Sequence, residues 1–373
     1  MKGVTTVKKF LTVLTAIVLL GLIACEGPAG PAGKDGAKGA DGAKGLDAGF
    51  VYFEGFKADI KCASCHNPDT DTTFYKAAAT FQWAASKHAN GGTAFESGAS
   101  CAECHTTEGF VQKMNGMTVT QKTNASPVGC FACHSPHKNG DFQLRKSTAV
   151  TLFSNFTGVA DYTFDYGKGN LCAQCHRPRT QTVKLDPSKS TATNDTIKIT
   201  STRWYSHYGV QSQMLMGKGG YEWANQTNVV SSSFHTTSTS IKADGCTICH
   251  MTTAQGDYSG GHSMKLESEE EGQNTNGCKV SGCHATTLTS LDYKSAMTIT
   301  HKNLDTLKVL LATAGWIDTV ANGPKVVTIT PSNKAGAIWN YFLVEHDLSS
   351  GIHNTAYANS LLRNSIAKMR GQF

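Results

Sequence analysis

One short pattern recurs along this chain: two cysteines three positions apart, with a histidine directly after the second. Five copies follow this spacing, and a sixth has two extra residues between its cysteines. In chain order they are motifs 1 to 6: Cys62/Cys65/His66, Cys101/Cys104/His105, Cys130/Cys133/His134, Cys172/Cys175/His176, Cys246/Cys249/His250 and Cys278/Cys283/His284. A random order of 13 Cys and 14 His in 373 residues would give about 0.02 copies of the regular motif, so the repetition is not accidental.

The three residues of the motif indicate one chemistry better than its alternatives. Disulfides need no histidine after each second cysteine, and zinc knuckles need no invariant histidine at that place. Covalent c-type haem uses all three residues, because each thiol adds to a vinyl group and the histidine becomes the proximal iron ligand. The sequence therefore predicts six c-type haems. Motif 6 fits if its two extra residues bulge outward.

A six-coordinate iron needs a second axial ligand, and the sequence supplies enough histidines for this. Eight histidines lie outside the motifs, for six iron positions. Bis-histidine ligation sets lower potentials than methionine/histidine ligation. From their local context we expect five of the eight to be distal ligands, the alternative for each being a surface or hydrogen-bonded histidine: His88, His137, His207, His235 and His262.

Several segments also resemble a known superfamily of multihaem proteins. The segment from Trp339 to Leu362 is similar to the closing segment of the superfamily that includes pentahaem nitrite reductase and octahaem hydroxylamine oxidoreductase. The Cys-His-Ser-Pro-His, Cys-His-Met and Gly-Gly-His stretches ending at residues 137, 251 and 262 resemble the same group. The resemblance implies that His353 is an axial ligand. His301 and His346 then remain as supernumerary histidines.

The same resemblance raises the question of whether the chain is an enzyme. The nitrite reductases of that group use a Cys-x-x-Cys-Lys haem, and this sequence has none. Because the histidines suffice to close every iron, we assign no catalytic residue and expect electron transfer to a redox partner or an extracellular acceptor. The chain also resembles the surface multihaem cytochromes of metal-reducing bacteria. The alternative is an oxidoreductase acting on a small nitrogen or sulfur species, such as nitrite or hydroxylamine, at one open haem.

The N-terminus predicts export and a lipid anchor. Lys2, Lys8 and Lys9 precede an apolar run from Phe10 to Ala24, which is short for a membrane span. The ending Leu-Ile-Ala-Cys resembles a bacterial lipobox, so we expect residues 1–24 to be a signal peptide and Cys25 to be lipidated. An uncleaved anchor is the alternative. This predicts an outer-membrane lipoprotein on the periplasmic or cell-surface face.

A collagen-like segment follows the lipidated cysteine. Seven Gly-x-y triplets run through residues 27–47. Glycine at every third position is what a triple helix requires. We favour a spacer between lipid and cytochrome, with a homotrimer or filament as the alternative. Lysines are scattered without a basic run, so nucleic-acid binding has no support.

These observations divide the chain into a signal peptide (1–24), a lipidated cysteine with spacer (25–49) and a hexahaem cytochrome domain (50–373). We expect a mainly α fold with long loops, organised around six covalent haems. The expected helices cover 74–88, 107–115, 303–315, 335–346 and, as the longest, about 354–370. Residues 183–202 have the pattern of a small β-hairpin insertion, and 324–330 that of one strand.

Overall fold

The computed structural model describes residues 57–59, 76–90, 97–179, 183, 185–224, 226, 233–280, 282–284 and 286–373. These residues belong to one unit that runs from Gly49 to Phe373. The predicted signal peptide, Cys25, the Gly-x-y segment and motif 1 (Cys62, Cys65 and His66) lie outside the described residues. The described part of the chain contains no helix that is both long and apolar enough to cross a membrane.

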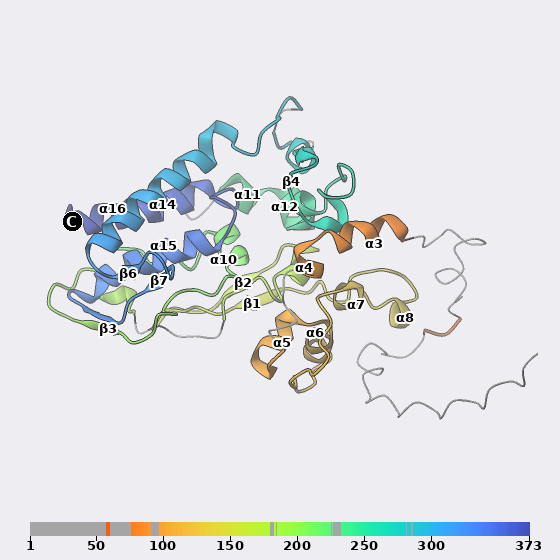
Figure 1. Cartoon of the computed structure of the whole chain (residues 1–373), viewed down its shortest axis with the longest axis horizontal. Helices are drawn as coiled ribbons and strands as arrows, with labels where there is room; N and C mark the ends of the chain where they lie inside the picture. Colours follow the sequence, from red (N-terminus) through yellow and green to blue (C-terminus); the bar gives the residue numbers. More distant parts are fainter. Residues whose placement is uncertain are drawn as a thin grey trace, which may run out of the picture. The chain divides into compact units, whose positions relative to one another are not determined.

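The fold is mainly helical with small two-stranded sheets, as the sequence predicts. Its longest helices are C-terminal: α14 (Ala296–Thr313), α15 (Gly336–His346) and α16 (Thr355–Met369). They pack against one another and appear in blue in Figure 1. α15 is buried on nearly every side, and the Asn354 side chain caps α16 by accepting from the Tyr357 N–H.

These helices share a large apolar core with the segments that pack on them. Trp339, Phe342 and Tyr357 are almost fully buried in it. The indole N–H of Trp339 donates to the Gly219 carbonyl at 2.8 Å. We call the three helices and the residues packed with them the C-terminal core. Its interior is filled by packed side chains.

The haem motifs lie on shorter elements, mostly one or two helical turns long. The remaining helices are α3 (Ala77–Ala84), α4 (Lys87–Asn90), α5 (Ala99–His105), α6 (Thr107–Met114), α7 (Cys130–Cys133), α8 (Pro136–Asn139), α9 (Gly169–Cys172), α10 (Gln211–Met216), α11 (Phe234–Thr237), α12 (Thr239–Asp244) and α13 (Thr247–His250). The 3-10 turns are η2 (Pro187–Lys189), η3 (Gly261–Ser263), η4 (Asn276–Lys279), η5 (Tyr293–Ser295) and η6 (Ser332–Ala335). We call residues 97–291 the motif region.

Close packing of α5 on α6 illustrates how such short helices are held. The Thr106 side chain caps α6 by accepting from the Gly109 N–H. A Cβ at Gly109 would lie 2.2 Å from the Ala102 carbonyl oxygen, so only glycine allows this approach. The turn between the two helices is therefore fixed by local sequence.

Four antiparallel strand pairs complete the fold. They are β1 (Val150–Leu152) with β2 (Tyr162–Phe164), β3 (Ile197–Ile199) with β8 (Val327–Ile329), β4 (Glu267–Ser268) with β5 (Gly272–Gln273), and β6 (Ile317–Asp318) with β7 (Gly323–Pro324). The predicted hairpin over 183–202 is wrong. Its strand β3 pairs instead with β8, in the register Ile197 to Ile329, because both strands bury their isoleucines in the C-terminal core.

The expected helices were found with shifted ends. The stretch 74–88 is two helices, α3 and α4, and 303–315 begins seven residues earlier as α14. The stretches 107–115 and 335–346 correspond to α6 and α15. The expectation that the last helix is the longest is wrong, since α14 has 18 residues and α16 has 15.

Candidate functional site: the paired histidines

Each described motif closes a short turn that places its cysteines and histidine together. In motifs 3, 4, 5 and 6 the backbone N–H of the histidine donates to the carbonyl of the first cysteine, at 2.8, 2.9, 2.9 and 3.0 Å. Motif 6 keeps this bond although its cysteines are further apart. Its two extra residues are accommodated by a turn in which the Cys283 N–H donates to the Val280 carbonyl at 3.0 Å. Motif 6 therefore keeps its two ends together despite the longer spacing.

Every described motif histidine faces a second histidine from a distant part of the chain. The ring centres are 6.1 to 6.4 Å apart in all five cases. We number these histidine pairs by their motifs. They are pair 2, His105 with His207 (6.2 Å); pair 3, His134 with His262 (6.4 Å); pair 4, His176 with His88 (6.1 Å); pair 5, His250 with His353 (6.1 Å); and pair 6, His284 with His235 (6.2 Å).

This spacing matches two imidazoles on opposite sides of one metal ion. A metal-bound imidazole nitrogen lies about 2.0–2.1 Å from the ion, and the ring centre roughly 1.1 Å beyond it, so two such rings have centres about 6.3 Å apart. Direct packing of two imidazoles has no reason to repeat one distance five times. The interplanar angles range from 41° to 83°, so what the pairs share is the separation.

The five pairs line one connected cavity of about 2940 Å³. All ten described motif cysteines line it too, with the five motif histidines and their five partners. Shared among five pairs, the volume is about 590 Å³ for each, within the ~300–1,000 Å³ typical of a cofactor site. The residues therefore fit large flat cofactors held by two thioethers and two imidazoles. In the described residues no group of three or more His, Cys, Asp or Glu gathers as a metal cluster, and the described cysteines form no disulfide.

Hydrogen bonds at Nδ1 orient the paired rings. The contacts at this atom include those of His88 with Met264 Sδ (2.9 Å), His134 with Gln143 O (3.3 Å), His176 with Gln211 Oε1 (3.1 Å), His235 with Ile352 O (2.9 Å), His250 with Met264 O (3.0 Å) and His353 with Asp347 Oδ1 (2.8 Å). Because Nδ1 is engaged, Nε2 is the nitrogen left to bind a metal. Sequence reasoning missed these partners, since none of them forms a motif.

The protonation states of the buried rings also suit metal binding. Burial, followed by the nearby His176 and His250, lowers the pKa of His88 to about 4. Burial, with His353 beside it, lowers the pKa of His250 to about 4. A neutral imidazole has the lone pair that a metal requires. His353 differs: burial opposes its charged form, but the charge and hydrogen bond of Asp347 outweigh burial and raise its pKa.

The other three histidines outside the motifs lie elsewhere. His137 is on α8, its carbonyl accepts from the Lys57 N–H at 2.8 Å, and its ring is 5.8 Å from Phe131. Its expected role as a distal ligand stays a prediction, because motif 1 lies outside the described residues. The two supernumerary histidines face no described motif histidine. His301 is exposed, and His346 is buried with its ring stacked on Tyr208 at 3.9 Å.

Contacts between cysteines of different motifs order the sites in space. The thiols of Cys104 and Cys175 are neighbours, and their hydrogen bond lowers the pKa of Cys104 to about 7. Cys172 contacts Cys246 in the same way, which raises the pKa of Cys246. Burial, followed by the two cysteines of motif 6, raises the pKa of Cys249 to about 12. Motif 4 therefore adjoins motif 2 and motif 5, and motif 5 adjoins motif 6.

Motif 3 joins the same arrangement beside motif 4. Burial, followed by the nearby Cys172, raises the pKa of Cys133 to about 12. A small apolar cluster of Phe110, Ala132 and Leu171 packs against Cys133 and against Cys175. The described sites thus form a row in the order 2, 4, 5, 6, with site 3 branching from site 4.

Comparison with known proteins supports the cofactor for part of the chain. Residues 57–135 match the family described as cytochrome c554 and c-prime. That stretch contains motifs 1, 2 and 3, so the match supports c-type haem attachment there. A comparison with the curated proteins gives no match. A solved structure, the crystal structure of outer cell wall cytochrome OcwA, aligns with 77% of this chain at 20% identity and a TM-score of 0.47. This chain covers 49% of that structure's length.

Proposed function

We propose that this chain is a hexahaem electron-transfer protein in which every iron is held between two histidines. The observation that carries the proposal is the common spacing of the five described histidine pairs inside one cavity. Both axial positions at each described site are supplied by the chain, which leaves no position for a substrate. Sites of this kind exchange electrons rather than transform a bound molecule.

The chain's contribution is to position the sites and set their environment. When bound, each haem supplies a one-electron iron couple. The contacts between motif cysteines place neighbouring sites close enough to define a route through sites 2, 4, 5 and 6, with site 3 as a branch. Site 1 joins through His137, which lies three residues after the motif 3 histidine. Sites 2 and 6 lie at separate ends of this route, as a conductor between a donor and an acceptor requires.

The proposed location follows from the N-terminal sequence and from the chemistry of attachment. Thioether attachment of haem takes place outside the bacterial cytoplasm, and the signal peptide and lipobox agree with that. We therefore place the protein on the outer membrane, anchored through Cys25. Its partner is another redox protein or an extracellular acceptor. We propose no nucleic-acid partner.

The first experiment uses the purified mature holoprotein. Haem is counted by the pyridine method, the spin state is read from the oxidised spectrum, and turnover of nitrite and hydroxylamine is assayed. The proposal expects six haems, a low-spin spectrum and no turnover. A high-spin signal together with turnover would show instead that one site is open and that the chain is an oxidoreductase.

A matched pair of variants tests the ligand assignment. His207→Ala removes one distal ligand from pair 2, so one haem in six should become high-spin while all six remain attached. His301→Ala removes an exposed histidine whose Nε2 contacts Ser350 Oγ at 2.9 Å, and it should leave the spectrum unchanged. Identical spectra for the two variants would contradict the assignment of pair 2.

The role of the Gly-x-y segment is tested separately. We propose that it acts as a spacer. Deleting residues 27–47 should therefore leave the number of chains per particle, measured by sedimentation, unchanged. A fall from trimer to monomer on deletion would show that the segment assembles three chains.

A further inference from the structure

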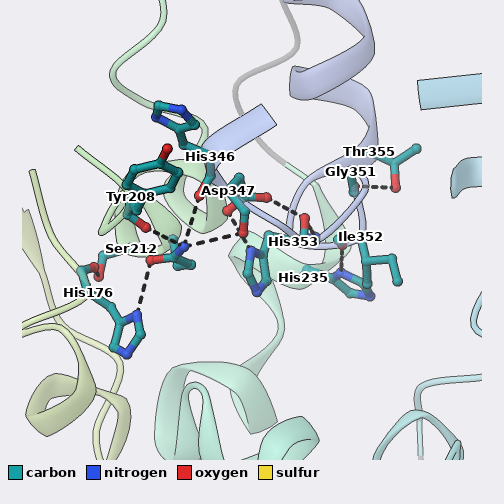
Figure 2. A network of polar contacts seen from close by, with 12 residues as sticks. His176, Tyr208, Ser212, His235, His346, Asp347, Gly351, Ile352, His353 and Thr355 are labelled. Atoms are coloured by element: carbon teal, nitrogen blue, oxygen red, sulfur yellow. Dashed lines mark hydrogen bonds and ion pairs between the residues drawn. The ribbon is translucent and has the colours of Figure 1, made fainter. Parts of the chain in front are cut away.

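The most unusual neighbour of the histidine pairs is a buried carboxylate. Asp347 directly follows α15, and its side chain is 0% exposed. Its Oδ1 accepts a hydrogen bond from His353 Nδ1 at 2.8 Å, and its Oδ2 accepts one from the Ser349 hydroxyl. Figure 2 shows this carboxylate directed at the His353 ring. Burying a carboxylate costs free energy unless it is paired. The contact with His353 therefore helps to compensate the buried charge of Asp347.

The partner of His353 differs in kind from those of the other rings. Among the six paired histidines with an Nδ1 contact given above, five contact neutral groups: three backbone carbonyls, one side-chain amide and one thioether. Only His353 in this set contacts a carboxylate. Both rings of pair 4 contact neutral groups, as does His250, which shares pair 5 with His353.

The position of Asp347 is fixed from a neighbouring site. The Gln211 side-chain amide donates to the carbonyls of His346 and Asp347, at 3.2 and 3.3 Å. The side-chain oxygen of Gln211, Oε1, lies 3.1 Å from His176 Nδ1. One glutamine thus joins a ring of pair 4 to the backbone that carries Asp347. These bonds hold the backbone at Asp347, and the Ser349 hydroxyl holds its carboxylate.

A carboxylate at Nδ1 changes the metal site through the ligand. It draws the Nδ1 proton toward itself, which makes the imidazole more basic and a stronger donor. Its negative charge in a buried setting also favours the oxidised, more positive iron. Both effects lower the reduction potential of the haem. Hydrogen bonding to groups beyond the ligands is an established means of setting haem potentials.

We propose that Asp347 is a positioning residue that lowers the potential of site 5 below those of its two neighbours, sites 4 and 6. This inference rests on the proposed function. Site 5 lies between sites 4 and 6, so an electron crossing the row must pass through it. Each transfer moves one electron between site 5 and a neighbouring haem, reducing one iron as it oxidises the other, with no atom exchanged. Because site 5 has the lower potential, electron transfer onto it from a neighbouring haem is the slow step. Site 6 therefore exchanges electrons slowly with sites 2, 3 and 4.

The test is Asp347→Asn in the full-length holoprotein, with haem counted before potentials are measured by spectroelectrochemical titration. We expect six haems, a shift of one low potential to more positive values, and an altered electron paramagnetic resonance signal from one low-spin haem. Asp305→Asn removes an exposed carboxylate from α14 and should change neither. Asp347→Glu keeps the charge and should restore a low potential.

Two further outcomes separate this inference from the proposed function. A wild-type protein without haem would overturn the proposed function itself. Six haems in Asp347→Asn with every potential unchanged would overturn only the role of Asp347. If Asp347→Asn loses a haem, Ser349→Ala serves as the second test. It frees the carboxylate from a competing donor, so the potential of site 5 should fall further. No shift, or a rise, in Ser349→Ala would contradict the inference.

Discussion

The C-terminal core and the motif region are built on different principles. The C-terminal core joins three helices of 11 to 18 residues around buried aromatic side chains. The motif region contributes some side chains to that core. Around its motifs it has helices of four to eight residues, one large cavity and only small apolar clusters. In the first, side chains fill the interior. In the second, the chain surrounds a space lined by paired histidines and cysteines, so its stability depends on the groups attached there.

The largest expected effect comes from removing one haem site from the motif region. Cys172→Ser with Cys175→Ser abolishes attachment at site 4, which adjoins three other sites. Amide hydrogen exchange in the motif region should accelerate more than tenfold, which corresponds to a fall of at least about 1.4 kcal/mol in the free energy of local opening. The amides of α15 and α16 should keep their protection. Exchange measured by mass spectrometry checks this. Equal loss of protection in both regions would show that they are one cooperative unit.

The converse change weakens the C-terminal core. Trp339→Ala deletes a side chain that is 1% exposed and should destabilise this region by about 3–5 kcal/mol. Trp316→Ala, at a partly buried position on the same core, should cost less. Denaturant titration followed by helical circular dichroism and by haem absorbance separates the regions. Simultaneous loss of both signals at one denaturant concentration would contradict their independence.

Acid should affect the packing around the histidine pairs of the haem-free chain. The pKa of His88 and that of His250 are about 4 when buried and about 6.5 in an unfolded chain. The unfolded state therefore binds more protons between these values, so stability is lost as pH falls from about 6.5 to 4, by on the order of 3 kcal/mol per histidine. Limited proteolysis across this pH range measures the loss. Resistance that is unchanged down to pH 4 would contradict the burial of these rings.

The smallest effect distinguishes the two supernumerary histidines. His301→Ala, on the exposed side of α14, should change unfolding free energy by less than about 0.5 kcal/mol. His346→Ala removes a buried ring that stacks on Tyr208 and whose Nδ1 is 2.8 Å from the Ser206 carbonyl. It should therefore destabilise the C-terminal core. Equal stability of the two variants would show that the packing around His346 contributes nothing.

The sequence predicted which residues lie together better than how they are arranged. The motif spacing indicated which cysteines and histidines line the cavity. Context selected four of the five histidines that lie opposite motif histidines, and the resemblance to the multihaem superfamily selected the fifth, His353. The sequence did not indicate which distal histidine faces which motif. His88 and His176 are 88 positions apart, and only the fold brings their rings together. Asp347 was missed because an aspartate after a helix has no local signature.

The errors in the fold have a similar cause. The alternating residues around Ile197 do form a strand, but local pattern does not identify its partner, and the wrong hairpin followed from assuming a nearby one. The start of α14 was placed too late because its first turns carry Thr, His and Lys, which give a weak helical pattern. Long, strongly apolar segments such as α15 were predicted closely.

One measurement tests the central claim most directly: near-infrared magnetic circular dichroism of the fully oxidised holoprotein, quantified per haem iron. This method identifies the pair of axial ligands on each low-spin iron. If the facing histidines hold the metal, the whole signal will be that of bis-imidazole ligation, with six irons per chain. A contribution from methionine, lysine or water ligation at any of the five described sites would contradict it.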